Sequence, residues 1–289
     1  MMGWRAGLLS AFLGAEFAFM SGCAGAAAQQ RPASIPSAAP ACGGNEIARG
    51  SVGRVLDGRD FVLDDGRQVH LAAIEVPLVP RPGGTAAKAA LAALLEGGQA
   101  VLREAELESD RYGRIVAYVE AWRGPSLRSA QAEMLSAGLA RVGGDVGGQA
   151  CAAELLRRES AARKAKLGLW ASPYYDPIQA DEPANILAQR DRFALVEGKV
   201  MSVHESGQTL YVNFGRRWSE DFAVTVRKRD ERNFAAAGLD LKTLGGRRVR
   251  VRGWIEAHGG SADASRAGAW HAPWIEAVHA VQIELADHD

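Results

Sequence analysis

The sequence predicts a mainly β protein with helices, organised as two small barrels in tandem. Short apolar runs alternate with turn residues, and glycine is frequent, at 33 of 289 residues. The order of three strands, one helix and two strands occurs twice along the chain. This order is typical of the OB-fold, a five-stranded barrel. We therefore expect an OB-fold barrel with appended helices, followed by a second OB-like β-barrel.

The composition is that of a globular protein, with 47% hydrophobic and 24% charged residues. These values exclude a disordered chain, a collagen-like fibre and a helical membrane bundle. The 34 Lys and Arg residues balance the 34 Asp and Glu residues, so no global positive field attracts nucleic acid from a distance. Binding of a polyanion is expected to be local.

The first barrel, expected at residues 45–170, begins with a three-stranded meander. Its central turn is Asp64-Asp65-Gly66-Arg67, because an Asp-Gly pair between apolar runs is a strong hairpin signal. The expected elements that follow are a helix at 85–95, strands at 100–107 and 114–121, and helices at 126–139 and 152–167. The last helix is amphipathic, with Glu159 and Lys164 expected among its surface charges.

The second OB-like β-domain is expected at residues 192–289. Its expected elements are strands at 195–203, 209–214 and 221–226, a helix near 230–237, and strands at 247–255 and 274–285. Residues 171–191 contain three prolines and lack apolar periodicity, which predicts a linker between the two domains.

The N-terminus predicts export. Arg5 precedes an apolar stretch, residues 6–20, that is too short for a membrane span but suits a signal peptide at 1–22. Met20-Ser21-Gly22-Cys23 resembles a bacterial lipobox, in which Cys23 would be lipidated, and the small residues 24–28 suit simple secretion equally well. Residues 23–44 are expected as a flexible tether. The expected location is the bacterial cell envelope, either as a lipoprotein or as a soluble periplasmic or secreted protein, with membrane contact only through the lipid anchor.

The remaining cysteines, Cys42 and Cys151, form an even pair in an oxidising compartment. A disulfide between them would close a loop of roughly a hundred residues and stabilise the fold by ~4 to 5 kcal/mol in the chain-entropy model. Two buried free thiols are the alternative.

Five short motifs occur in order along the first domain. They are Val55-Leu56-Asp57-Gly58, the run from Leu71 to Pro77, Asp110-Arg111-Tyr112-Gly113-Arg114, the run from Gly138 to Val142, and Gly168-Leu169-Trp170. With these motifs, residues 50–170 resemble the staphylococcal nuclease (thermonuclease) family. The resemblance implies calcium-dependent phosphodiester hydrolysis, with oxygen ligands for the cation, a carboxylate base and two arginines that stabilise charge on the phosphate.

The resemblance also assigns roles to positions, and several of them are substituted here. Arg59 stands at the first calcium carboxylate, whereas Glu75 retains an oxygen ligand at the second. Leu78 replaces the base, His70 replaces the first phosphate-binding arginine, and Arg114 retains the second. Two unit charges ~4 Å apart interact by about 4 kcal/mol at an effective dielectric near 20. Because Arg59 turns an attraction for calcium into a repulsion, we expect the calcium site to be absent or very weak, and no other cofactor is expected.

Other residues of the first domain are candidates for substrate binding. Arg111 and Tyr112 match positions that contact the nucleotide in the family. Arg59 either binds a phosphate or carboxylate in the former metal site or pairs with Asp57 or Asp60 at the hairpin. Asp60 is a poor replacement ligand, because a shift of one residue along a strand turns the side chain to the other face. His70 is either an acid or base in catalysis or a packed side chain.

The second domain contains a strand, residues 247–254, in which arginine and valine alternate. Arg250 and Arg252 would make one face basic, with Trp254, Trp270 or Trp274 as platforms for stacking. This pattern favours a groove for single-stranded nucleic acid or another polyanion. The alternatives are a solvated strand face and contact with a protein partner. Histidine and cysteine spacing gives no support for zinc.

The sequence thus favours an exported, degenerate member of the thermonuclease family that binds nucleic acid or another polyanion, with hydrolysis weak or lost. The first alternative is a working phosphodiesterase whose site is rebuilt around Glu75, Arg114 and His70, with another metal as an option. The second alternative is a structural envelope protein whose barrels are interaction modules. Enzymatic activity and oligomeric state are left open by the sequence.

Overall fold

The structure is a computed structural model that describes residues 42–123, 125–146, 148–257 and 272–286. The expected signal peptide, the lipidation site Cys23 and nearly all of the expected tether lie outside the described residues. Within the described ranges, no helix has the length and apolar character needed to cross a membrane.

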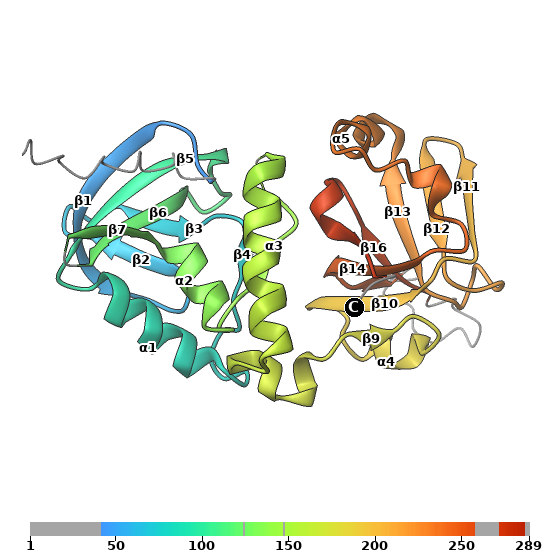
Figure 1. Cartoon of the computed structure of the whole chain (residues 1–289), viewed down its shortest axis with the longest axis horizontal. Helices are drawn as coiled ribbons and strands as arrows, with labels where there is room; N and C mark the ends of the chain where they lie inside the picture. The colour runs from blue at the N-terminus through green and yellow to red at the C-terminus, as the bar shows by residue number, and fades with distance from the viewer. Residues whose placement is uncertain (1–41, 124, 147, 258–271, 287–289) are drawn as a thin grey trace, which may run out of the picture. The chain divides into compact units, whose positions relative to one another are not determined.

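Five strands of the first domain close into a barrel (Figure 1). They are β1 (Glu46–Val55), β2 (Asp60–Leu63), β3 (Gln68–Leu71), β5 (Gln99–Ser109) and β6 (Ile115–Arg123). The strands are ordered β3-β2-β1-β5-β6, and β3 pairs in parallel with β6 to close the barrel. The predicted barrel and its Asp-Gly hairpin between β2 and β3 are confirmed.

Helices and short strands surround this barrel. They are β4 (Ile74–Glu75), α1 (Gly84–Leu95), β7 (Ser126–Ser129), α2 (Ala130–Ser136), β8 (Arg141–Val142), α3 (Gln149–Lys164) and the 3-10 turn η1 (Gly168–Ala171). The predicted helix at 126–139 is shorter than expected, because its first four residues form β7 on the edge of β6. Ser129 then caps α2, its hydroxyl accepting from the Ala132 amide at 3.3 Å.

A single apolar core fills the barrel. Phe61, Leu71 and Leu102 are fully buried within it, and α1 contributes Leu91 to the same cluster. The predicted disulfide between Cys42 and Cys151 is present and joins the segment before β1 to α3 across a sequence separation of 109 residues.

The C-terminal region contains two further sheets. Its elements are η2 (Pro173–Tyr175), β9 (Ile178–Gln179), α4 (Pro183–Leu187), β10 (Phe193–Lys199), β11 (Ser202–Ser206), β12 (Thr209–Asn213), β13 (Ala223–Arg227), η3 (Lys228–Asp230), α5 (Glu231–Ala236), η4 (Leu241–Leu244), β14 (Arg248–Trp254), β15 (Glu256–Ala257), β16 (Pro273–Glu276), η5 (Ala280–Gln282) and β17 (Ile283–Leu285). One sheet has the order β17-β14-β10-β9 and the other the order β11-β12-β13-β16-β15.

The two C-terminal sheets share one core. Val196, Val212 and Val251 are fully or almost fully buried in it. Ala180 and Ile186 join the same core, so part of the segment predicted as a linker is packed with the C-terminal sheets. β9 extends one of these sheets by parallel pairing with β10.

Candidate functional site

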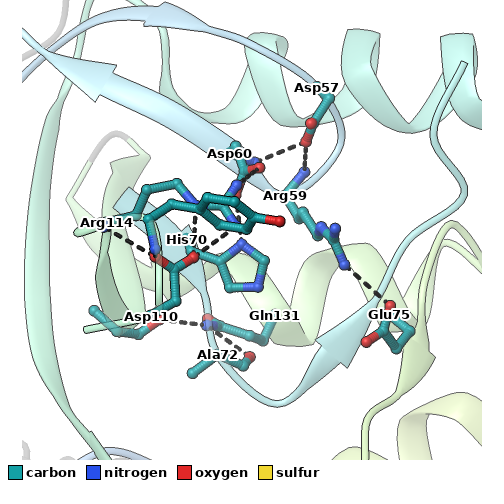
Figure 2. Close-up of polar contacts among 11 residues, drawn as sticks. Asp57, Arg59, Asp60, His70, Ala72, Glu75, Asp110, Arg114 and Gln131 are labelled. Carbon is teal, nitrogen blue, oxygen red and sulfur yellow. Dashed lines mark hydrogen bonds and ion pairs between the residues drawn. The ribbon is translucent and has the colours of Figure 1, made fainter. Parts of the chain in front are cut away.

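Six polar side chains meet at one end of the barrel, which we call the barrel-mouth cluster (Figure 2). Its members are Arg59, Asp60, His70, Glu75, Asp110 and Arg114. They come from the β1–β2 turn, from the first residue of β2, from β3 and β4, and from the β5–β6 turn. Asp60 and His70 are direct partners on antiparallel strands, so their side chains lie on one face of the sheet.

The β1–β2 turn positions the first two members. The Asp57 carboxylate accepts hydrogen bonds from the backbone amides of Arg59 at 2.8 Å and of Asp60 at 2.9 Å, the pattern of an Asx-turn. Gly58 packs against α1, where a Cβ would lie 2.8 Å from the Ala87 Cβ atom. The motif Asp57-Gly58 therefore fixes the direction in which Arg59 leaves the turn.

Arg59 and Glu75 form a half-buried ion pair. The Arg59 Nη1 atom donates to Glu75 Oε2 at 3.1 Å, and the two side chains are 18% and 19% exposed. Burial raises the pKa of Glu75, while the positive charges of Arg59 and Arg141 oppose this shift. The Arg59 Nε atom is buried without a hydrogen-bond partner. The guanidinium is thus committed to the carboxylate that the resemblance assigns to calcium.

Asp60 binds two basic side chains, those of His70 and Arg114. It is 4% exposed, its Oδ1 atom lies 2.5 Å from His70 Nδ1, and its Oδ2 atom accepts from Arg114 Nη1. Arg59 binds Glu75, whereas Asp60 binds His70 and Arg114, so these two neighbours in sequence have separate partners. The role of Asp60 as the shared partner of His70 and Arg114 was not predicted.

Arg114 is anchored from two sides. Its Nε atom donates to Asp110 at 2.7 Å, while Asp110 also accepts from the backbone amides of Tyr112 and Arg114. Burial opposes the charge on Arg114, but the Asp110 hydrogen bond and the charge of Asp60 hold its pKa above the ordinary value. Tyr112 is 68% exposed, and the guanidinium groups of Arg111 and Arg114 lie 4.9 and 5.2 Å from the centre of its ring.

His70 and Glu75 contribute to one cluster because the strand ends between them. β3 ends at Leu71, Ala73 has a left-handed φ of 64°, and β4 begins at Ile74. Gln131 on α2 supports this turn from below, donating to the carbonyls of Ala72 and Ala117 and accepting from the Val119 amide (Figure 2). Gln131 is fully buried. This role of Gln131 was not predicted from the sequence. The signal that could have indicated it is a lone amide side chain on an otherwise apolar helix face.

Calcium does not fit this arrangement. The guanidinium of Arg59 lies within hydrogen-bond distance of Glu75, and Leu78, at the expected base position, offers no side-chain oxygen. Over the described ranges, no group of three or more His, Cys, Asp or Glu side chains is arranged to hold a metal ion.

The predicted basic strand of the second domain requires correction. Arg250 is 6% exposed and donates to Glu197, its cross-strand partner, at 2.9 and 3.2 Å. Arg252 is fully buried. Both guanidinium groups bind carboxylates within the protein, so neither is presented to a polymer, and the groove predicted from the arginine and valine alternation is not formed on β14.

Arg252 belongs to a second set of charges, the buried ion cluster, which consists of Glu159, Arg163, Arg252 and Glu284. Arg252 donates to both Glu159 oxygens, at 2.8 and 3.0 Å, and also to Glu284. The prediction that Glu159 is a surface charge is wrong, because this side chain is fully buried. Burial favours the protonated acid, but the charge of Arg252 and its hydrogen bonds outweigh burial and lower the pKa of Glu159.

Trp254 is 46% exposed, as a stacking platform requires, but its surroundings are acidic. It lines a cavity of about 330 Å³ together with four carboxylates, those of Glu75, Asp145, Glu256 and Glu276. Two of these carboxylates, Glu75 and Glu276, are paired with Arg59 and Arg227. The nucleic-acid contact expected at Trp254 stays a prediction.

Comparison with known proteins agrees with the barrel and its motifs. The family model described as staphylococcal nuclease homologue matches residues 68–172. Protein ParB of Escherichia coli is 34% identical over 134 residues, a match that covers 44% of this chain and 74% of the relative. On these matches and on the closed five-stranded barrel, the chain belongs to the family of staphylococcal nuclease homologues.

Proposed function

We propose that the barrel binds a phosphodiester polymer and that calcium-dependent hydrolysis is lost. Membership of a nuclease-homologue family supports nucleic acid as the ligand class. The observation that carries the loss of hydrolysis is the Arg59 to Glu75 ion pair at 3.1 Å. Since calcium affinity follows the number of anionic ligands, a guanidinium at this position opposes the cation.

The polymer would bind along the exposed side of the barrel-mouth cluster. Arg111 and Tyr112 project to solvent next to Arg114. Arginine pairs with phosphate oxygens, and an aromatic ring stacks on a base of any identity. Arg59 and Arg114 are already paired with carboxylates, so the exposed Arg111 is the side chain that would pair with phosphate.

The proposal is tested with purified mature protein, labelled DNA and RNA, and calcium or a chelator. We expect binding in fluorescence anisotropy that does not depend on calcium, and no calcium-dependent cleavage on gels. Brisk calcium-dependent cleavage that is abolished by Arg114→Ala would overturn the proposal.

A reversion experiment tests the assignment of positions. The triple variant Arg59→Asp, His70→Arg and Leu78→Glu restores the family residue at each substituted position. We expect calcium binding by calorimetry and some calcium-dependent cleavage. A folded triple variant that binds no calcium would show that Arg59 does not account for the loss, and the single variant Arg59→Met controls for removal of the guanidinium alone.

A second candidate function is metal-independent phosphodiester hydrolysis, which the Asp60 to His70 contact of 2.5 Å favours. An aspartate that accepts from Nδ1 leaves Nε2 of the imidazole as a base, the arrangement used to activate a nucleophile. The His70 side chain is 18% exposed, so a water molecule can reach it. This candidate predicts cleavage that persists in chelator and is lost in His70→Gln.

We also propose that the protein works in the cell envelope. The Cys42 to Cys151 disulfide supports an oxidising compartment. Intact-mass measurement of the protein purified from membranes distinguishes a lipidated Cys23 from simple cleavage, and an uncleaved N-terminus would contradict export.

A further inference from the structure

We infer that the C-terminal sheet β11-β12-β13 carries a site for the unpaired bases of single-stranded nucleic acid. The site is a cavity of about 520 Å³ on this sheet, within the size range of ligand pockets. Its principal lining residues are His204, Tyr211, Asn213, Trp218, Thr225 and Trp274. The inference takes from the proposed function only that the ligand is a nucleic acid.

Strand alternation places these side chains away from the core. Leu210, Val212 and Val224 are fully or almost fully buried in the apolar cluster between the sheets, so the residues between them point to the opposite face. His204, Tyr211 and Thr225 are successive partners across β11, β12 and β13, which lie side by side (Figure 1). The three strands thus present one row of side chains to the cavity.

Two rings in this row form a flat surface. The His204 and Tyr211 rings are stacked, with centroids 5.2 Å apart and planes 12° from parallel. The Asn213 Nδ2 atom donates to His204 Nδ1 at 2.9 Å and to the Ser202 hydroxyl at 3.3 Å. The amide therefore fixes the imidazole orientation. A ring held by its neighbours loses little entropy when a base stacks on it.

The cavity has polar groups, and no Asp, Glu, Lys or Arg is among the described residues that line it. Asn213 and Thr225 are each 7% exposed and supply an amide and a hydroxyl at its floor. Such a lining suits the uncharged, planar base of a nucleotide, whose phosphate stays outside. Arg216 is adjacent in sequence to the cavity mouth, two residues before Trp218.

Trp218 lies at the mouth of the cavity and is 80% exposed. A base stacked on this exposed ring would remove apolar surface of both partners from water. Stacking on aromatic side chains contributes about 1 to 3 kcal/mol per base. Of the three platforms expected from the sequence, Trp274 lines this cavity, Trp254 lies on β14, and Trp270 lies outside the described residues.

The experiment compares a labelled 15-nucleotide oligo-dT with a 15-base-pair duplex in fluorescence anisotropy, using the full mature chain. Bases within a duplex cannot enter the cavity, so we expect tighter binding of oligo-dT. Trp218→Ala and Tyr211→Leu should each weaken oligo-dT binding by roughly 5- to 150-fold, as expected from the energy of one stacked base. Duplex binding should be unchanged. Trp122→Ala, which removes an aromatic residue that is 51% exposed in the first domain, is the matched control.

The outcomes separate this inference from the proposed function. Loss of oligo-dT binding in Tyr112→Ala but not in Trp218→Ala or Tyr211→Leu would overturn the inference and leave the barrel proposal standing. The reverse pattern would support the inference and contradict the barrel proposal. Binding of a neutral oligosaccharide, cellohexaose, that is lost in Trp218→Ala would assign the cavity to sugars and overturn the inference. Because Trp218 is 80% exposed, its replacement by alanine should leave the protein folded, and a loss of binding in this variant would not result from unfolding.

Discussion

The barrel-mouth cluster and the buried ion cluster use the same chemistry in opposite surroundings. Both join arginine to carboxylates at hydrogen-bond distance. The Arg59 and Glu75 side chains are 18% and 19% exposed, whereas those of Arg252 and Glu159 are 0% and 1% exposed. Charges that keep contact with water can exchange partners with a ligand, but charges that have lost it depend on each other.

This difference assigns the two clusters different roles. In the buried ion cluster, Arg252 on β14 is fully buried and binds Glu159 on α3. This ion pair joins the barrel domain to the C-terminal sheets. Next to the barrel-mouth cluster, Arg111 and Tyr112 expose a cation and an aromatic ring to solvent. Stability should therefore depend mainly on the buried ion cluster, and binding mainly on the barrel-mouth cluster.

The largest expected effect is on stability, from Glu159→Gln. This change leaves the Arg252 guanidinium buried without its main counter-charge, which typically costs about 3 to 5 kcal/mol. Equilibrium unfolding in urea measures it. Glu154→Gln on the same helix is the matched control, since its partners Arg157 and Arg158 are on the surface and such pairs contribute about 0 to 1 kcal/mol. Equal effects of the two changes would refute the assignment of roles.

The same cluster predicts a dependence of stability on acid. The pKa of Glu159 is lower in the folded protein than its ordinary value of 4.5. Its ionised form therefore stabilises the fold above pH 4.5, and this contribution is lost as the pH falls from there through the folded-state pKa. The free energy of unfolding should fall less steeply below pH 4.5 in Glu159→Gln than in the unchanged protein. Parallel pH profiles would contradict the lowered pKa.

The sequence predicts the barrel well because its signals are local. The Asp-Gly hairpin, the apolar run of β2 and the glycine after α1 each depend on neighbouring residues. The buried ion cluster could not be predicted in this way. Glu159 and Arg252 are 93 residues apart, and a charged side chain is ordinarily expected at the surface, although Glu159 lies on the buried face of α3 with Cys151, Leu155 and Ala162. Only the packing of α3 against β14 turns them into buried partners.

The barrel-mouth cluster could be predicted from the sequence only in part. The substitution of Arg59 for a metal carboxylate is visible in the motif, and so is the alternative that it binds a carboxylate. The identity of that carboxylate, Glu75, depends on the end of β3 and the left-handed Ala73. The role of Asp60 depends on its register with His70. Family motifs thus place the residues, and tertiary structure decides their partners.

An intermediate effect is expected from Asp60→Asn in the barrel-mouth cluster. Asp60 is nearly buried and shared by His70 and Arg114, so loss of its charge should destabilise the protein by about 1.5 to 3 kcal/mol. The effect is smaller than for Glu159 because Arg114 retains Asp110. Urea unfolding measures it, with Asp65→Asn, an exposed partner of Arg67 on the next turn, as the control. A loss above that of Glu159→Gln would invert the comparison.

The smallest effect on stability, with a clear effect on binding, is expected from Tyr112→Ala. The ring is 68% exposed and lies beside the guanidinium groups of Arg111 and Arg114. Its removal should therefore lower the free energy of unfolding by about 0.5 to 1 kcal/mol. If the ring stacks on a base, affinity for nucleic acid should fall by roughly 5- to 150-fold. Trp122→Ala, another exposed aromatic residue of the same domain, should leave affinity unchanged. A Tyr112→Ala protein that keeps full affinity would remove the barrel-mouth cluster from the binding surface, because this ring is its most accessible aromatic contact.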